Sequence, residues 1–390
     1  MRKNGLCSVM LLFALCLLVS CTPSPSGVQD EVDYPSYGID TSLYDEAAAN
    51  RYNSRNGEFC SIPGMVLFAN EGKATAFWRL YYYNKATDSA DLFCFDPLCQ
   101  HTSCVARLFA DPSDIVYCAF DGQLYGTPVS SGVRDGQPFG NDNLYRIDLD
   151  TMEITRVFEG DGNELLDIFT LDEYIFFRRV GEGGRRELFR YDVATEKYEL
   201  LPAPEDRQFG AVIVSGDAIY VNFSNELELY RTNKDFSSFR NTGLLKHSSV
   251  VDSQMYWQEP THGDDGSTTF YEGNLQTGAV REVGTYPYDF EYQGFDENYL
   301  YVCIYGYETG VATARSSVLH RIDIKTGELE RMLDCSADGS ILSVHVDDGR
   351  VFLHQRRAQA GANADHTFWY LTQNDKGEWE KHSVFSKQGE

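Results

Sequence analysis

The sequence is poor in positive charge: it holds 33 Lys and Arg against 59 Asp and Glu, a formal net charge of −26. So acidic a protein is repelled by phosphate polymers, which argues against nucleic-acid binding. No long stretch has the periodicity of an amphipathic helix. The chain also lacks a G-x-S-x-G turn, an H-E-x-x-H pair and a glycine-rich phosphate loop. The sequence therefore identifies no reaction, and whether the protein is an enzyme stays open.

A short phrase returns seven times along the chain. Each copy starts with Leu or Phe, is rich in aromatic residues, and ends with Asp, Asn or Thr at the head of a polar turn, as in Leu144–Asp148 (LYRID). Its apolar positions suit a half-buried strand, and an Asp or Asn side chain can bond the backbone two residues on. The copies begin at Leu80, Leu144, Leu188, Leu229, Phe270, Leu319 and Phe368.

A second landmark precedes every copy, namely a short apolar run that most often follows a polar turn. Tyr174–Phe177 and Tyr299–Val302 are examples. Two landmarks in fixed order, at intervals of mostly about 40–50 residues, are typical of a β-propeller. We predict an all-β fold with seven four-stranded blades over residues 57–390, each phrase forming the third strand of a blade. Six or eight blades also fit, because the first unit is the least regular.

The N-terminus resembles a bacterial lipoprotein signal. Arg2 and Lys3 precede an apolar stretch, Leu6–Val19, that is too short to span a bilayer comfortably. Leu18–Cys21 (LVSC) then offers a small residue before a cysteine that can accept lipid. We predict a signal peptide over 1–20, acyl chains such as palmitate on Cys21, and a flexible tether over 21–56. The expected location is the bacterial cell envelope, anchored to the membrane on its extracytoplasmic side. An ordinary secretory peptide is the alternative.

Three cysteines and a histidine cluster after the first phrase with the spacing C-x4-C-x-H-x2-C. Cys94, Cys99, His101 and Cys104 could supply the tetrahedral ligand set that zinc prefers, which would make this a structural zinc site. Disulfide bonding is the alternative for an exported chain, with Cys60 or Cys118 as an outside partner. A disulfide gives no reason for the histidine. Cys303 and Cys335 are expected to be core thiols or an accidental pair.

Uneven loop lengths predict a binding face. The loops between second and third strands are long and variable, whereas the opposite face has only short turns, and variable loops on a rigid scaffold often carry ligands. Arginines that fall on the long-loop side could bind a carboxylate, although exposed arginines are ordinary. They are Arg134, Arg185, Arg186, Arg315, Arg356 and Arg357. His262 with Asp264 and Asp265, or His366 with Asp365, could hold a cation, but such runs are more often solvated loops.

The mature region resembles a family of uncharacterised bacterial β-propeller lipoproteins, some of them similar to low-density-lipoprotein-receptor-like propellers. The resemblance rests on the phrase at Leu319–Glu328 and on the Cys94–Cys104 cluster. The Y-W-T-D motif of the receptor repeats is missing, so that kinship is architectural. The family implies a surface protein with no established reaction. We therefore expect a scaffold that binds a peptide, glycan or protein; the alternative is an enzyme that acts on a polysaccharide or peptide through the long-loop face.

Overall fold

The computed structural model describes most of residues 59–385. The segments outside the description within this range are 63, 72–77, 96–97, 100–103, 105, 107–116, 121, 128–131, 135–136, 140–141, 161–164, 205–206, 216–217, 225, 246–248, 252–253, 259–266, 305–317, 336–338 and 358–364.

The described residues form seven four-stranded antiparallel sheets, which are the blades of a propeller. Blade 1 is β1 Phe59–Ile62, β2 Met65–Glu71, β3 Trp78–Asn84 and β4 Ser89–Leu92; blade 2 is β5 Tyr117–Phe120, β6 Gln123–Gly126, β9 Leu144–Asp148 and β10 Ile154–Phe158; blade 3 is β11 Leu165–Leu171, β12 Tyr174–Val180, β13 Arg186–Asp192 and β14 Lys197–Leu200. Blade 4 is β15 Phe209–Ser215, β16 Ala218–Phe223, β17 Glu228–Thr232 and β18 Phe239–Leu245; blade 5 is β19 Ser249–Val251, β20 Gln254–Gln258, β21 Thr268–Asn274 and β22 Val280–Tyr286. Blade 6 is β23 Phe290–Phe295, β24 Tyr299–Ile304, β25 Val318–Asp323 and β26 Leu329–Asp334; blade 7 is β27 Ser340–Asp347, β28 Arg350–Arg357, β29 Asp365–Gln373 and β30 Trp379–Ser383.

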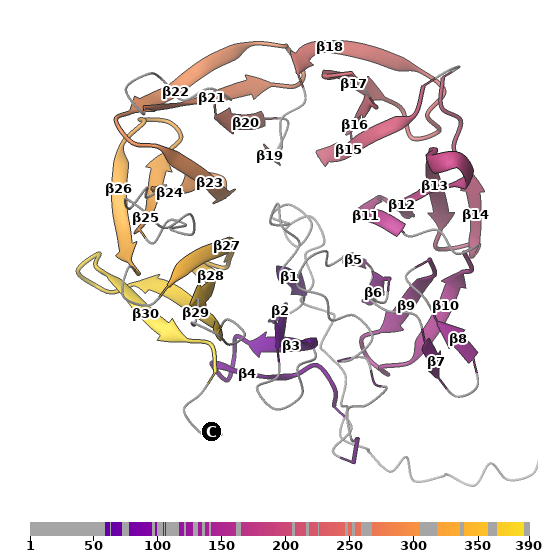
Figure 1. Ribbon diagram of the computed structural model, residues 1–390, viewed down its shortest axis with the longest axis horizontal. Coiled ribbons are helices and arrows are strands. Elements are labelled where there is room, and N and C mark those ends of the chain that lie inside the picture. The colour runs from indigo at the N-terminus through magenta and orange to yellow at the C-terminus, as the bar shows by residue number, and fades with distance from the viewer. Residues whose placement is uncertain are drawn as a thin grey trace, which may run out of the picture. The chain divides into compact units, whose positions relative to one another are not determined.

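The blades follow one another around a ring in chain order, with the first strand of each nearest the centre (Figure 1). The predicted seven-bladed propeller is thus confirmed. All seven phrases lie in third strands, and the apolar runs before them lie in second strands. The second blade also holds a short hairpin, β7 Gly132–Arg134 with β8 Gln137–Phe139. The first unit, which is the least regular in sequence, forms four strands that pair in order without a register shift.

The polar residue that ends each phrase organises the turn to the outer strand. In blade 6, for example, Asp323 Oδ1 accepts hydrogen bonds from the backbone N–H groups of Lys325 and Thr326, at 2.9 and 2.8 Å. The last copy departs from the prediction. Thr372 stays in β29 and its Oγ1 lies 3.0 Å from His382 Nε2, while Asn374 receives the turn N–H groups instead. The turn after β29 thus begins two residues later than predicted. A shift of two residues leaves each side chain of the strand on the same face of the sheet.

The core is divided among the seven interfaces between neighbouring blades, one hydrophobic cluster to each. Alternation along the second strands produces this division. On β24, for example, Leu300 and Val302 pack toward blade 5, whereas Tyr301 and Cys303 pack toward blade 7. Both faces of every blade are therefore apolar, as stacking in a ring requires.

The interface between blades 7 and 1, called the closing interface below, joins the two ends of the ring without a shared sheet, since β1–β4 and β27–β30 each form a complete blade. Its buried cluster is mainly aromatic: Phe59, Val66, Phe68, Tyr83, Phe352, Phe368, Tyr370 and Val384. Polar ties supplement it. Ser61 Oγ and His345 Nε2 share a hydrogen bond of 2.9 Å, and Lys85 Nζ lies 2.6 Å from Asp347 Oδ2.

Candidate metal site

The cysteine cluster begins immediately after the outer strand of the first blade. Phe93, which is fully buried, donates its N–H to Leu80 O at 3.0 Å and so fixes the chain at the start of the loop. Phe95 packs on the rings of Tyr82 and Phe93, at centroid distances of 5.2 and 5.7 Å. The local fold therefore holds Cys94 between two anchored aromatic side chains.

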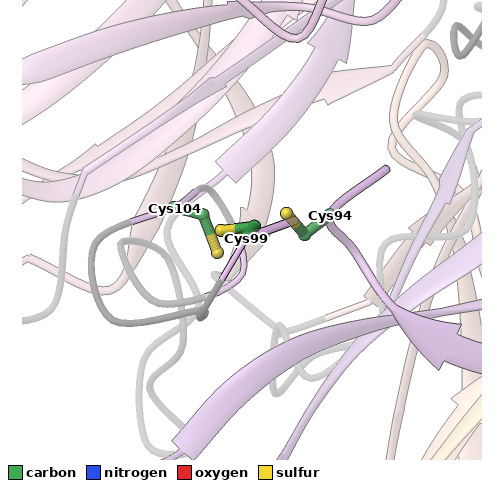
Figure 2. A group of neighbouring side chains, drawn as sticks. All are labelled: Cys94, Cys99 and Cys104. Atoms are coloured by element: carbon green, nitrogen blue, oxygen red, sulfur yellow. The ribbon is translucent and has the colours of Figure 1, made fainter. Parts of the chain in front are cut away.

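The loop brings three of the predicted ligands together. The Sγ atoms of Cys94, Cys99 and Cys104 all lie within 4.8 Å of one another. Figure 2 shows the three side chains as neighbours, with the sulfurs of Cys99 and Cys104 close to each other and Cys94 on the other side of Cys99. Zn–S bonds of about 2.3 Å in a tetrahedral site would place the sulfurs ~3.8 Å apart. Small side-chain movements therefore suffice to close the three sulfurs around one ion.

Burial and the neighbouring sulfurs favour the neutral thiol at Cys104 when no cation is bound. The pKa of the Cys104 thiol is raised to about 12, first by burial and then by the neighbouring Cys94 and Cys99. Each sulfur that ionises opposes ionisation of the next, because like charges this close repel. A bound divalent cation would reverse the sign of this effect and favour the thiolates. The chemistry of the donor set thus fits a thiophilic metal.

The fourth predicted ligand, His101, lies outside the described residues, as does Cys21. No disulfide joins Cys94, Cys99 and Cys104 among the described residues. Cys60, considered above as a disulfide partner, is instead buried in the cluster between blades 1 and 2, and its thiol lies 3.7 Å from Ser61 O. Burial raises the pKa of Cys60 to about 12, as expected for an inert core thiol. The side chain of Cys118 is outside the description.

Among the sequence candidates that the structure describes, none joins the three cysteines. Cys303 and Cys335 are fully buried between blades 6 and 7, in agreement with their interpretation as core residues. His366 pairs with the buried His354, their Nδ1 and Nε2 atoms 2.8 Å apart. The cation candidates His262, Asp264 and Asp265 lie outside the described residues, and so do most of the long loops that were predicted to form a binding face.

Two polar residues of blade 1 were not selected from the sequence. Asn70 and Arg79 pair across β2 and β3, and both Asn70 Oδ1 and Arg79 Nε are buried without a hydrogen-bond partner among the described residues. Buried polar atoms normally have partners. No motif surrounds either residue, and their common face becomes visible only once the register of the two strands is known.

Comparison with known proteins establishes the fold alone. No family model and no curated protein matches the sequence. The chain is similar in structure to puromycin hydrolase, at 14% identity and a TM-score of 0.53, over 91% of this chain and 57% of that one. A mutant of that hydrolase complexed with PGG gives a TM-score of 0.55 at the same identity and coverage. Oligogalacturonate lyase in complex with manganese is matched at 14% identity and a TM-score of 0.46, over 83% of this chain and 85% of that one.

The chain thus spans little more than half the length of the hydrolase that it matches, and what the two share is the fold. Membership of the lipoprotein family stays a prediction. Within the part of the chain that the structure describes, no helix is both long and apolar enough to cross a bilayer.

Proposed function

We propose that this protein is a lipid-anchored bacterial surface propeller that binds a peptide, glycan or protein on its long-loop face. The observation that carries the proposal is the asymmetry of the blade connections. First and second strands are joined by tight turns such as 172–173 and 348–349, whereas second and third strands are joined by segments such as 127–143 and 305–317. Such an arrangement leaves one face of a rigid ring free to vary.

The proposed anchor is Cys21, within the Leu18–Cys21 sequence described above. It holds the protein on the extracytoplasmic side of the membrane, because two or three acyl chains give stable attachment. Mass spectrometry of the protein purified from a bacterial host should find a diacylglyceryl group on Cys21 as the first residue. A Cys21→Ser variant should leave the membrane fraction. An unmodified Cys21 would refute the anchor without affecting the binding proposal.

The binding role is tested with the soluble domain, residues 57–390, on peptide and glycan arrays. We expect retention of at least one ligand class without turnover. Conversion of a retained ligand would instead support the alternative, a propeller enzyme that acts on a polysaccharide or peptide. Retention of nothing on either array would count against both functions.

We further propose that Cys94, Cys99 and Cys104 hold a structural zinc ion, with His101 as the expected fourth ligand. The support is the convergence of three sulfurs within 4.8 Å. Elemental analysis of the purified domain should give about one zinc per chain. Cys99→Ser should lower that content severalfold, whereas Cys60→Ala, which removes a buried thiol outside the cluster, should not. Metal-free protein with oxidised cysteines would refute the proposal.

A further inference from the structure

The upper end of the closing interface, where the strands of blades 7 and 1 reach the long-loop face, collects basic and amide side chains. Alternation places them there. On β3, Tyr81 and Tyr83 pack into the cluster shared with blade 7, so Arg79 two residues earlier lies on the same side of the sheet. On β2, Phe68 packs into the same cluster, and Asn70 follows it on that side, directly opposite Arg79.

Blade 7 presents three more basic side chains to the same level. His354 is 2% exposed and stacks on Phe368, with ring centroids 4.4 Å apart. Arg356 and His366 pair across β28 and β29, one step beyond His354 and Phe368 on the same side of the sheet. Phe368 in turn contacts Phe68 of blade 1, at a centroid distance of 4.6 Å. In both blades, therefore, polar residues follow the Phe68–Phe368 contact toward the long-loop face.

The charge of this region is opposite to that of the protein. On the described parts of β2, β3, β28 and β29, no carboxylate lies on the side that faces the closing interface. Several arginines elsewhere in the chain pair with a carboxylate: Arg179 with Glu187, Arg321 with Glu330 and Arg207 with Glu226. The buried Nε of Arg79, by contrast, has no acceptor among the described residues. An unpaired, partly buried guanidinium costs free energy unless something else binds it.

We propose that the upper end of the closing interface is a binding site for a carboxylate that carries a neighbouring hydroxyl or N–H group. Nε and one Nη of Arg79 form the edge of the guanidinium that takes a carboxylate with two parallel hydrogen bonds. Asn70 Oδ1, buried beside it without a donor among the described residues, accepts from the neighbouring group of the ligand. From the opposite blade, Arg356 contributes positive potential, and the hydrogen-bonded His354–His366 pair contributes further polar ring nitrogens.

Two sources share this chemistry, namely a uronic-acid sugar and the free carboxyl end of a peptide. The site deepens the proposed ligand-binding role and rests on it. It also predicts that a ligand spans blades 7 and 1, which no sheet joins, so that binding should stabilise the ring by mass action.

The test is calorimetric titration of the soluble domain with galacturonate and with N-acetylglycylphenylalanine, beside galactose and the dipeptide amide as neutral counterparts. We expect one of the two acids to bind and its neutral counterpart not to bind. Arg79→Met should weaken that binding about tenfold or more, since it removes a charged pair of hydrogen bonds and keeps the apolar stem. Arg240→Met, the same change at an exposed arginine of blade 4, should leave it unchanged.

A second measurement separates binding from a structural role. Without ligand, Arg79→Met should melt at the same temperature as the wild type or higher, because the buried Nε that it removes has no acceptor among the described residues. Equal binding by Arg79→Met, equal binding of the neutral counterparts, tighter binding of inorganic phosphate, or no binding of either acid would overturn the site. If neither acid binds and the arrays still retain another ligand, the site fails and the proposed function stands.

Discussion

The closing interface and the interface between blades 3 and 4 have similar cores but differ in how the chain connects them. Both bury an inner-strand phenylalanine, Phe59 in the first and Phe209 in the second, among other aromatic rings. The chain runs directly from blade 3 into blade 4 after Leu201, whereas nothing covalent joins blade 7 to blade 1. When two directly connected blades separate, the connecting segment keeps them close together, so their contacts re-form readily. Two blades without a direct connection are held together by their contacts alone.

The polar ties of the two interfaces also differ. Between blades 3 and 4, Arg190 donates to the carbonyl of Lys234 at 2.9 Å, and Lys234 forms an ion pair with Asp172. At the closing interface, the hydroxyls of Tyr83 in blade 1 and Tyr370 in blade 7 both donate to Asp88 Oδ1, each at 2.5 Å. The closing interface therefore relies on a carboxylate, and its strength should depend on pH.

The largest expected effect comes from removing the two matched phenylalanines. Phe59→Ala and Phe209→Ala should each lower the free energy of unfolding by about 3–5 kcal/mol, measured by urea denaturation, because each leaves a cavity in an aromatic cluster. Only Phe59→Ala should also open the ring locally. Amide hydrogen exchange in β1 and β27 should then accelerate about a hundredfold relative to β11 and β15. Equal acceleration at both interfaces would contradict the importance of the covalent connection.

A smaller effect should appear on acidification. The hydrogen bonds from Tyr370 and Tyr83 lower the pKa of Asp88 below its ordinary value, so the unfolded chain takes up this proton first as the pH falls. The contribution of Asp88 to stability is thus present above the pKa of the unfolded state and is lost as the pH falls through the folded one. Melting temperatures from pH 7 to pH 3 should decline less steeply for Asp88→Asn than for the wild type.

Asp150→Asn is the control for that measurement. Asp150 is an exposed carboxylate in a turn of blade 2, a blade that belongs neither to the closing interface nor to the interface between blades 3 and 4. It should retain the wild-type slope. A parallel decline in Asp88→Asn and the wild type would show that the tyrosine–carboxylate tie does not contribute to the closing interface.

Much of the propeller could be read from local pattern. The phrase at Leu319–Asp323 contains both the alternation of a strand and the Asp that caps its turn, and both signals depend only on near neighbours. The same reasoning failed at Thr372, since a strand that runs two residues longer keeps its faces unchanged and only the hydrogen bonds reveal where its turn begins.

The sites followed a different rule. The convergence of Cys94, Cys99 and Cys104 was predictable because all three lie on one short loop. Asn70 and Arg79 could not be found that way, because neither has a motif and the residues opposite them lie in the last blade of the chain. Arg79 stands out because its buried Nε has no acceptor in the part of the chain that the structure describes, which only the packed structure can reveal.

The sequence by itself determined the strand order, the number of blades and the cysteine cluster, because each is encoded by short-range spacing and alternation. Tertiary structure alone decided how the ring closes: the first and last blades meet through aromatic packing, Asp88 and the basic residues above them, with no shared strand. The physical reason is that these contacts join residues nearly 300 positions apart, such as Asp88 and Tyr370, whose proximity depends on the accumulated geometry of all seven blades.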